Sequence, residues 1–411
     1  IIDKLDHLED LGINTIWITP IVDNIDINQG AGFKTAEGLE AKQYAYHGYW
    51  AQDFTKLEPT LGDIETFKRL IDKAHDRGIK IMVDVVLNHA GYGTENLDQF
   101  AGMFRDPSEG NNEQNSWVSG LPDFKTEDPA VRNKLIEWQS SWLETLRTDR
   151  GDTIDYFRVD TVKHVDDTTW KAFKNTLTKI DPNFKLIGEY WGAGYLENYG
   201  QLRTGQMDSL LDFTFKDIAE AFVKGQIEKA EQSLIERNQF IDNTAVLGQF
   251  LSSHDEDGFL YRLNGDLGKF MVAVSLQITA KGQPVIYYGE EIGQSGKSDW
   301  VWKDDVIYSF GQNRESFDWE KLEKGDETAL LLHNHYQKLL KIRAEYSKVF
   351  SKGTRAWIDG GDDVQYSVHK REYDGQTIYV GLNISDEVKT VSLAVDYPKG
   401  TVLKDLYNNQ T

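Results

Sequence analysis

Four acidic residues stand at or near the carboxyl ends of four apolar runs. Asp84, Asp160, Glu189 and Asp255 belong to the runs 79–86, 154–160, 185–189 and 245–255. For any one of them alone, a helix N-cap or a solvated loop acid would be the simpler interpretation. Two carboxyl groups that flank a glycosidic bond are the minimal equipment for its hydrolysis. If the four runs are neighbouring strands, their acids can converge on one pocket, and we expect glycosidase chemistry there.

The neighbours of two of these acids indicate different roles. Arg158 lies two residues before Asp160, on the same strand face because side chains alternate along a strand. A cation there would keep Asp160 ionised, as a nucleophile requires, although a purely structural ion pair is the alternative. Tyr190 and Trp191 follow Glu189, and we expect this aromatic setting to keep Glu189 protonated as a general acid.

The elements that position these residues follow a repeating pattern. A short β-branched apolar run is followed by a longer segment of helical period, which is typical of βαβ units. Seven runs are candidate strands: 14–18, 79–86, 154–160, 185–189, 208–213, 245–255 and 284–289. An eighth strand lost upstream of residue 1 would complete a closed (β/α)8 barrel, which we favour over an open doubly wound sheet. We expect helices capped by Asp63 and Asp128 between the runs, and the chain ends look trimmed.

The spacing of the runs predicts three parts. The barrel would comprise residues 1–87 and 128–348, and the long excursion 88–127 would form an inserted subdomain after the third strand. From residue 349 to residue 411 the apolar period changes to two, which predicts an antiparallel β-sandwich domain that is incomplete.

Composition excludes several classes of protein. The 411 residues carry a formal net charge of −22, which argues against nucleic acid and anionic membranes as partners. The absence of cysteine excludes disulfides and thiol chemistry, and no apolar run approaches the length of a membrane span. We expect a monomer that acts on a neutral substrate.

Eight segments, in order, resemble those of one enzyme family. DVVLNH (84–89), FRVDTVKH (157–164), GEYW (188–191) and SSHD (252–255) resemble the four conserved segments of the α-amylase family of retaining glycosidases. The secondary segments of that family are similar to GINTIWITP (12–20), YHGYWAQDF (46–54), LPDF (121–124) and GQPVIYYGEE (282–291). The resemblance covers the chain from residue 1 to about residue 344, and the trailing β domain matches the family's C-terminal domain.

The resemblance implies roles for individual residues. Asp160 would be the nucleophile, Glu189 the acid and base, and Asp255 the third carboxylate that stabilises the transition state, while Asp84 would support them. The residues that would bind or support the substrate are Tyr49, His89, Arg158, Lys163, His164, His254 and Arg314. Among these, Tyr49 would stack on the glucose at the cleaved bond, and Lys163 and His164 would contact the reducing-end side. The family's usual acid partner of Arg314 has no clear match, although Asp304 and Asp305 are near it.

The resemblance also implies a calcium ion between the barrel and the inserted subdomain. Its ligands would be Asn88, Asp123 and the backbone carbonyl of His164, since Ca²⁺ prefers oxygen ligands. Gln114 and Asn115 stand where the family has a further acidic ligand.

The expected function is endo-acting hydrolysis of α-1,4-glucosidic bonds in starch and maltooligosaccharides by a retaining double displacement. One alternative is a neopullulanase- or cyclomaltodextrinase-like hydrolase. Another is a non-catalytic carbohydrate-binding barrel, which would require one of the three carboxylates to be missing. A polymeric substrate leads us to expect an extracellular or cell-surface location in a bacterium.

Overall fold

The computed structural model describes residues 1–25, 33–34, 40–42, 45–110, 112–298, 301–303, 306–308, 311–395 and 397–409. Its internal contacts divide the chain into two compact units. The first comprises Ile1–Ala193, Glu197–Leu211 and Val301–Ser309, and the second comprises Gly194–Leu196, Asp212–Trp300 and Phe310–Thr411. Asp304 and Asp305 lie outside the described residues.

A parallel sheet forms the centre of the first unit. Its hydrogen-bonded order is β1-β6-β7-β8-β9, and its strands are β1 (Thr15–Ile18), β6 (Lys80–Val85), β7 (Tyr156–Val159), β8 (Lys185–Gly188) and β9 (Ser209–Asp212). Every residue of β6 after Lys80 is buried, as expected for a parallel strand covered on both faces. Each of these strands was predicted from its apolar run.

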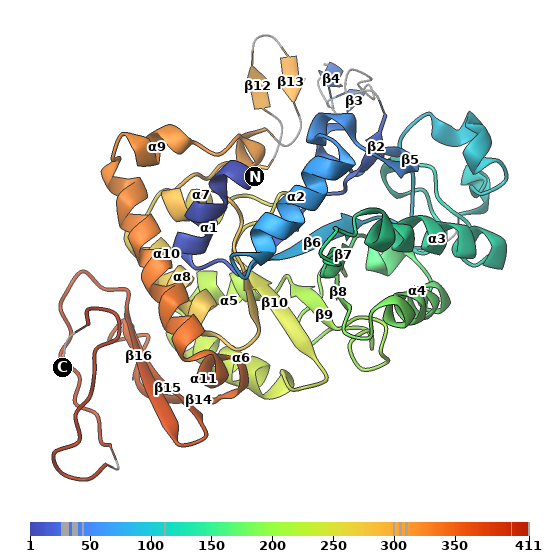
Figure 1. The fold of residues 1–411 in the computed structure, drawn as a ribbon. Helices are drawn as coiled ribbons and strands as arrows, with labels where there is room; N and C mark the ends of the chain where they lie inside the picture. The colour runs from blue at the N-terminus through green and yellow to red at the C-terminus, as the bar shows by residue number, and fades with distance from the viewer. Residues whose placement is uncertain are drawn as a thin grey trace. The chain divides into compact units, whose positions relative to one another are not determined.

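Four α-helices accompany these strands: α1 (Leu5–Leu11), α2 (Ile64–His75), α3 (Pro129–Thr145) and α4 (Asp167–Ile180). Figure 1 shows α2 beside β6 and α3 beside α4. The predicted caps are confirmed, because Asp63 accepts a hydrogen bond from the backbone NH of Thr66 and Asp128 accepts one from Ala130. These caps fix where α2 and α3 begin.

Short strands outside the parallel sheet follow β1 and also lie at 301–303 and 306–308. The strands β2 (Val22–Asn24) and β5 (Ala51–Leu57) pair with each other, and a second small sheet has the order β12-β13-β4-β3. Its strands are β3 (Phe33–Lys34), β4 (Glu40–Lys42), β12 (Val301–Lys303) and β13 (Val306–Tyr308). The apolar alternation in these segments is too short to have predicted them.

The predicted insertion 88–127 is irregular and is held by aromatic packing. Its described residues form 3-10 turns, and the isolated bridges of the segment are His89–Asp123 and Phe104–Phe124. Phe124 packs against Phe54 and Phe100, and Trp138 of α3 stacks on Phe54 with ring centroids 5.8 Å apart. This aromatic cluster holds the insertion against β5 and α3.

The second unit contains a parallel strand pair, β10 (Val246–Phe250) and β11 (Gln283–Val285), both predicted from apolar runs. Its helices are α5 (Phe215–Val223), α6 (Ile227–Phe240), α7 (Phe259–Arg262), α8 (Leu267–Thr279), α9 (Trp319–Glu323), α10 (Glu327–Glu345) and α11 (Ser347–Lys352).

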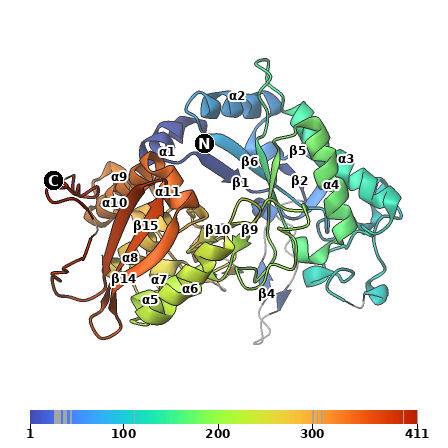
Figure 2. The ribbon, with the colours of Figure 1, turned by 90° about the horizontal axis from the view of Figure 1, so that it is seen from below.

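An antiparallel sheet follows α11 in the same unit. It consists of β14 (Thr354–Gly361), β15 (Tyr366–Tyr373) and β16 (Gln376–Asn383), and Figure 2 shows it next to α6. Glu231 of α6 is fully buried, and its Oε2 accepts hydrogen bonds from Nε and Nη2 of Arg355 in β14. The segment predicted to alternate with period two, 349–411, includes Val391, Leu393 and Val395, but no strand forms at 391–395. The full set of predicted domain boundaries stays a prediction.

The helices of the described residues do not meet the requirements of a membrane span. None of them is both long enough and apolar enough to cross a bilayer.

Candidate active site

A buried guanidinium organises the acids of the first unit. Arg158 is 1% exposed, and its Nη1 lies 2.8 Å from Asp160 Oδ1 and 2.9 Å from Asp84 Oδ2. Its Nη2 lies 2.8 Å from Glu189 Oε2. The structure thus brings together three of the four acids at strand ends, and it does so around the arginine that the sequence analysis placed beside Asp160.

The strand register accounts for this convergence. Asp84 and Arg158 are direct partners in the parallel pairing of β6 with β7, so their side chains leave the sheet at the same level. Asp160 follows β7, and its NH still donates to the carbonyl of Val85. A turn at Thr161, whose φ of 49° lies in the left-handed region, then directs the chain away from the sheet. The carboxylates are therefore positioned by regular sheet geometry.

Glycine is required immediately before Glu189. A Cβ at Gly188 would lie 2.9 Å from side-chain atoms of both Leu210 and Val162, which is too close for real contacts. The backbone of Glu189 is fixed on both sides, because its NH donates to Val159 and its carbonyl accepts from Val162. The glycine lets β8 approach its neighbours closely enough to deliver the Glu189 side chain to Arg158.

One cation faces three acids, and this imbalance decides their protonation. Burial is the largest single effect on Asp160 and would raise its pKa, but the charge of Arg158, together with His89 and the hydrogen bonds to the carboxylate, outweighs burial and leaves the pKa below its usual value. Burial raises the pKa of Asp84 to about 7. The positive charge of Arg158 lowers this pKa, but the negative charge of the adjacent Asp160 offsets part of that effect. Of Asp84 and Asp160, Asp160 is thus the acid that stays ionised as the pH falls through neutrality.

The environment of Glu189 differs from the expected aromatic setting. Its carboxylate contacts the guanidinium of Arg158, and its Oε2 accepts a hydrogen bond from the backbone NH of Thr161 over 3.2 Å. The two aromatic residues after it lie further out: Trp191 is 48% exposed, and the ring of Tyr190 stacks on Tyr199 with centroids 4.1 Å apart. The ion pair with Arg158 and the backbone NH of Thr161, rather than aromatic packing, therefore position Glu189.

Tyr49 and His89 lie in the same cluster. The hydroxyl of Tyr49 donates to Asp84 Oδ2 over 2.6 Å, and the Tyr49 ring lies 5.9 Å from the guanidinium carbon of Arg158. His89 is buried, which lowers its pKa, and its Nε2 lies 3.2 Å from the carbonyl of Tyr49. Trp17, which the sequence analysis missed, stacks on Arg158 at 4.9 Å and donates to Asp84. Its place in an apolar run concealed this role.

Lys163 and His164 contact the inserted segment instead of the acid cluster. The Nζ of Lys163 lies 2.8 Å from Glu113 Oε1, and Nδ1 of His164 lies 2.7 Å from the Glu113 carbonyl. Both residues follow Asp160 through the turn at Thr161. Their binding of the leaving part of a substrate stays a prediction.

The three predicted calcium ligands lie together. The end of the Asn88 side chain lies 3.2 Å from Asp123 Oδ1 and 3.0 Å from the carbonyl of His164. With its amide NH2 turned toward these oxygens, Asn88 donates to both, so the groups are also satisfied without an ion. Arg105 donates to Asp123 Oδ2 over 3.0 Å. These oxygens suit Ca²⁺ in kind but supply fewer ligands than its usual six to eight, and calcium binding stays a prediction.

In the second unit, the predicted residues Asp255, His254 and Arg314 lie together. Arg314 Nη2 donates to Asp255 Oδ1 over 3.0 Å, and His254 Nε2 lies 3.1 Å from Asp255 Oδ2. The Nε of Arg314 also donates to the carbonyl of His254 over 2.7 Å. Asp255 is therefore held by a cation on one side and an imidazole on the other, in a turn between β10 and α7.

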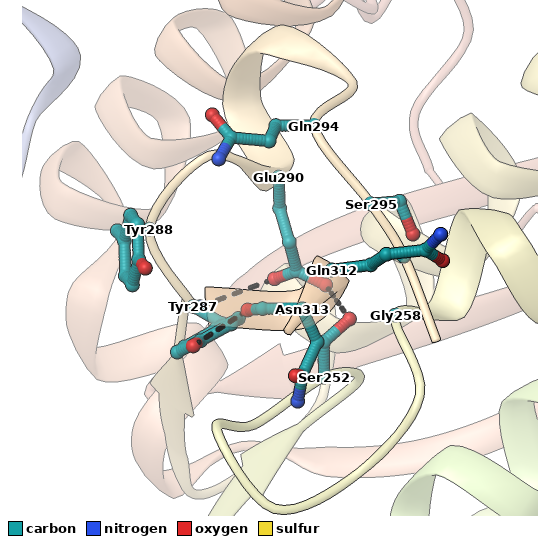
Figure 3. A pocket seen from close by; sticks show the side chains of 10 residues that line it. Ser252, Gly258, Tyr287, Tyr288, Glu290, Gln294, Ser295, Gln312 and Asn313 are labelled. Carbon is teal, nitrogen blue, oxygen red and sulfur yellow. Dashed lines mark hydrogen bonds between the residues drawn. The ribbon is translucent and has the colours of Figure 1, made fainter. Parts of the chain in front are cut away.

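A small pocket of the second unit lies beside this turn (Figure 3). Glu290, which is 3% exposed, accepts hydrogen bonds from the Ser252 hydroxyl over 2.5 Å and from the backbone NH of Tyr287 over 3.2 Å. Burial raises the pKa of Glu290 to about 8, and the nearby charge of Glu291 adds to this effect. Glu290 is thus a buried acid that is largely neutral at pH 7.

Comparison with known proteins gives consistent relatives. A family model described as the alpha amylase catalytic domain matches residues 1–117 and 103–354. Neopullulanase 2 of Thermoactinomyces vulgaris is 28% identical over 434 residues, which cover 98% of this chain and 65% of that protein. Intracellular maltogenic amylase of Bacillus subtilis strain 168 is 26% identical over 411 residues, covering 96% of this chain and 62% of that protein. The chain thus spans about two thirds of the length of these relatives.

A solved structure supports the fold. The structure of an Anoxybacillus alpha-amylase is similar with a TM-score of 0.79 and 26% identity, covering all of this chain and 84% of that one. The predicted fold class, a (β/α)8 barrel followed by a C-terminal antiparallel β-sheet, is confirmed.

The expected extracellular or cell-surface location, and with it the expectation of a secreted protein, is wrong as inferred. It was deduced from a polymeric glucan substrate alone. A relative that covers 96% of this chain is named an intracellular maltogenic amylase. Glucan chemistry in this fold therefore does not require an extracellular location.

Calcium binding can be tested by thermal unfolding. If Ca²⁺ binds the folded protein at Asn88, Asp123 and the His164 carbonyl, millimolar calcium should raise the melting temperature and EDTA should lower it. Asp123→Asn should abolish this response to calcium, since it removes the only carboxylate of the proposed set. Glu109→Gln, a change of an exposed acid in the same segment, should retain it. Identical melting in calcium and EDTA would remove the site.

The raised pKa of Glu290 should make the free energy of unfolding depend on pH. Its pKa rises from 4.5 when unfolded to about 8 when folded, so between these values the folded state holds more protons and the free energy of unfolding falls as the pH rises. Glu290→Gln cannot lose a proton. The melting temperature of the unmodified protein, minus that of the variant, should therefore fall from pH 5 to pH 9. Glu315→Gln, at an exposed position, should show no such trend, and a pH-independent difference for Glu290→Gln would refute the assignment.

Proposed function

The chain belongs to the alpha-amylase family, and from that premise we propose that it hydrolyses α-glucosidic bonds in maltooligosaccharides by a retaining double displacement. Asp160 attacks the anomeric carbon, and Glu189 protonates the departing glycosidic oxygen. A water molecule then replaces the leaving sugar, gives its proton to Glu189, and releases the glucosyl group from Asp160. Asp255, by its match to the family segment, acts as the third carboxylate.

The observation that carries this proposal is the sharing of Arg158 by Asp160 and Glu189. One guanidinium lies against both carboxyl groups, and the pKa of Asp160 is below its usual value, so we infer that Asp160 is the ionised member of the pair and that Glu189 carries the proton. The free enzyme therefore holds an ionised nucleophile next to a protonated acid, which is the state that the first step requires. The alternative of a non-catalytic carbohydrate-binding barrel would require one of the three carboxylates to be missing, and Asp160, Glu189 and Asp255 are all present.

The preferred substrate is proposed to be a short or cyclic maltooligosaccharide, as in the neopullulanase- or cyclomaltodextrinase-like alternative of the sequence analysis. The relatives named neopullulanase, cyclomaltodextrinase and maltogenic amylase support this alternative. Internal cleavage of starch is the second candidate. It is favoured by the LPDF segment (121–124), which resembles that of starch-cleaving members, and by the similarity to an alpha-amylase structure.

Turnover on four substrates separates these two candidates. We expect kcat/KM per molecule on γ-cyclodextrin and maltopentaose to exceed that on soluble starch, and pullulan to release panose. Asp160→Asn should abolish turnover on all four, because the covalent step needs the carboxylate, whereas Asp149→Asn, at an exposed position, should match the unmodified protein. Rapid loss of starch–iodine colour without cyclodextrin cleavage would favour the starch candidate. No release of reducing ends from any of the four would contradict the proposed function.

A further inference from the structure

The turn that carries Asp255 has little regular structure of its own. It follows β10 and includes Ser253 to Asp257, and its internal hydrogen bonds are weak: Asp255 NH to the Ser253 hydroxyl at 3.2 Å and Glu256 NH to the Ser253 carbonyl at 3.5 Å. The Asp255 carboxylate can act at a reacting centre only if this backbone is held in place. The position of Asp255 therefore depends on contacts from outside the turn.

One side chain makes most of these backbone contacts. The Nδ2 of Asn313 lies 3.0 Å from the carbonyl of His254, 3.1 Å from that of Glu256 and 3.5 Å from that of Ser253. It thus faces the carbonyls on both sides of Asp255. Asn313 is 7% exposed, so these bonds are made away from bulk water, where an amide donor is worth more than at the surface.

Asn313 is itself anchored by its backbone. Its carbonyl accepts a hydrogen bond from the Tyr287 hydroxyl over 2.9 Å, and its NH donates to the carbonyl of Lys297 over 3.3 Å. Figure 3 shows Asn313 with Tyr287 and Glu290 around the pocket. The amide is therefore a fixed point rather than a side chain that follows the turn.

Asn313 and Arg314 are adjacent in the chain and hold Asp255 in different ways. Arg314 contacts the Asp255 carboxylate directly, whereas Asn313 contacts only the backbone that carries it. The carboxamide of Asn313 supplies donors where an aspartate, of nearly the same shape, would present oxygens to three carbonyl oxygens. The geometry depends on the amide group itself.

We propose that Asn313 is a positioning residue for the reaction, which sets the placement of Asp255 through the carbonyls of the Ser253–Glu256 turn. This inference rests on the proposed function, in which Asp255 is the third carboxylate. It goes beyond that function by assigning a kinetic role to a residue that makes no contact with the acid itself. Asn313→Asp should displace the turn while leaving Arg314 and Asp255 in the chain.

The test is a double-mutant cycle on turnover of maltopentaose and of 4-nitrophenyl α-maltotrioside. Asn313→Asp should lower kcat by about 10²-fold, a typical cost of misplacing a catalytic group by about 1 Å, with a much smaller change in KM. In an Asp255→Asn background the same substitution should lower kcat by no more than about twofold, because the group that Asn313 positions has already been removed. The activated substrate keeps the slow variants measurable.

A matched control separates positioning from general stability. Asn238 is also buried, and its Nδ2 donates to the carbonyl of Gly353 in the same unit. Asn238→Asp should lower the melting temperature and leave kcat unchanged below that temperature. If Asn313→Asp does not fold, Asn313→Ala takes its place in the cycle.

Two outcomes overturn the inference: an unchanged kcat for the Asn313 variant, or the same fold loss in both backgrounds. An unmodified protein that turns over neither substrate would instead contradict the proposed function.

Discussion

A single buried guanidinium, that of Arg158, has to balance three carboxyl groups at once, and the chemistry of the first unit follows from this constraint. One cation cannot keep three acids ionised at 2.8 to 2.9 Å. The pKa of Asp84 is raised to about 7, while that of Asp160 stays below its usual value. The shared arginine therefore does more than hold the acids together: it helps to keep Asp160, the proposed nucleophile, ionised, while Asp84 takes up a proton near neutral pH.

The scaffold meets this constraint through rigid elements. Register pairs Asp84 with Arg158 across two parallel strands, and Gly188 lets the next strand approach closely enough for Glu189 to reach the same cation. Arg158 is also stacked on Trp17, so its charge is desolvated but supported by an aromatic face. The turn of Asp255 lacks such regular support, which is why an amide from a distant segment has to hold it.

Apolar periodicity predicted the strands of the parallel sheet, but neither the short strands outside it nor the contacts between loops. The strands that carry Asp84, Asp160 and Glu189 follow from runs such as 79–86 and 154–160, because parallel strands are buried on both faces. The run 391–395 has a similar alternation and forms no strand, since alternation shows only that a segment could pair. The role of Asn313 could not be predicted, because a side-chain amide that reaches loop carbonyls about 60 residues away leaves no periodic signal. The proposed catalytic acids were first indicated by their places at the ends of apolar runs, and their individual roles by the ordered segments.

The central claim, that Asp160 is the ionised nucleophile beside a protonated Glu189, is tested most directly by trapping the glycosyl-enzyme. In Glu189→Gln, α-maltotriosyl fluoride can still react, because fluoride leaves without acid assistance, but hydrolysis of the intermediate lacks its base. Intact-mass spectrometry should show one added maltotriosyl group, and peptide mapping should place it on Asp160. The adduct should be absent when Asp160→Asn is added. An adduct on another residue, or fluoride release with inversion and no adduct, would contradict the account.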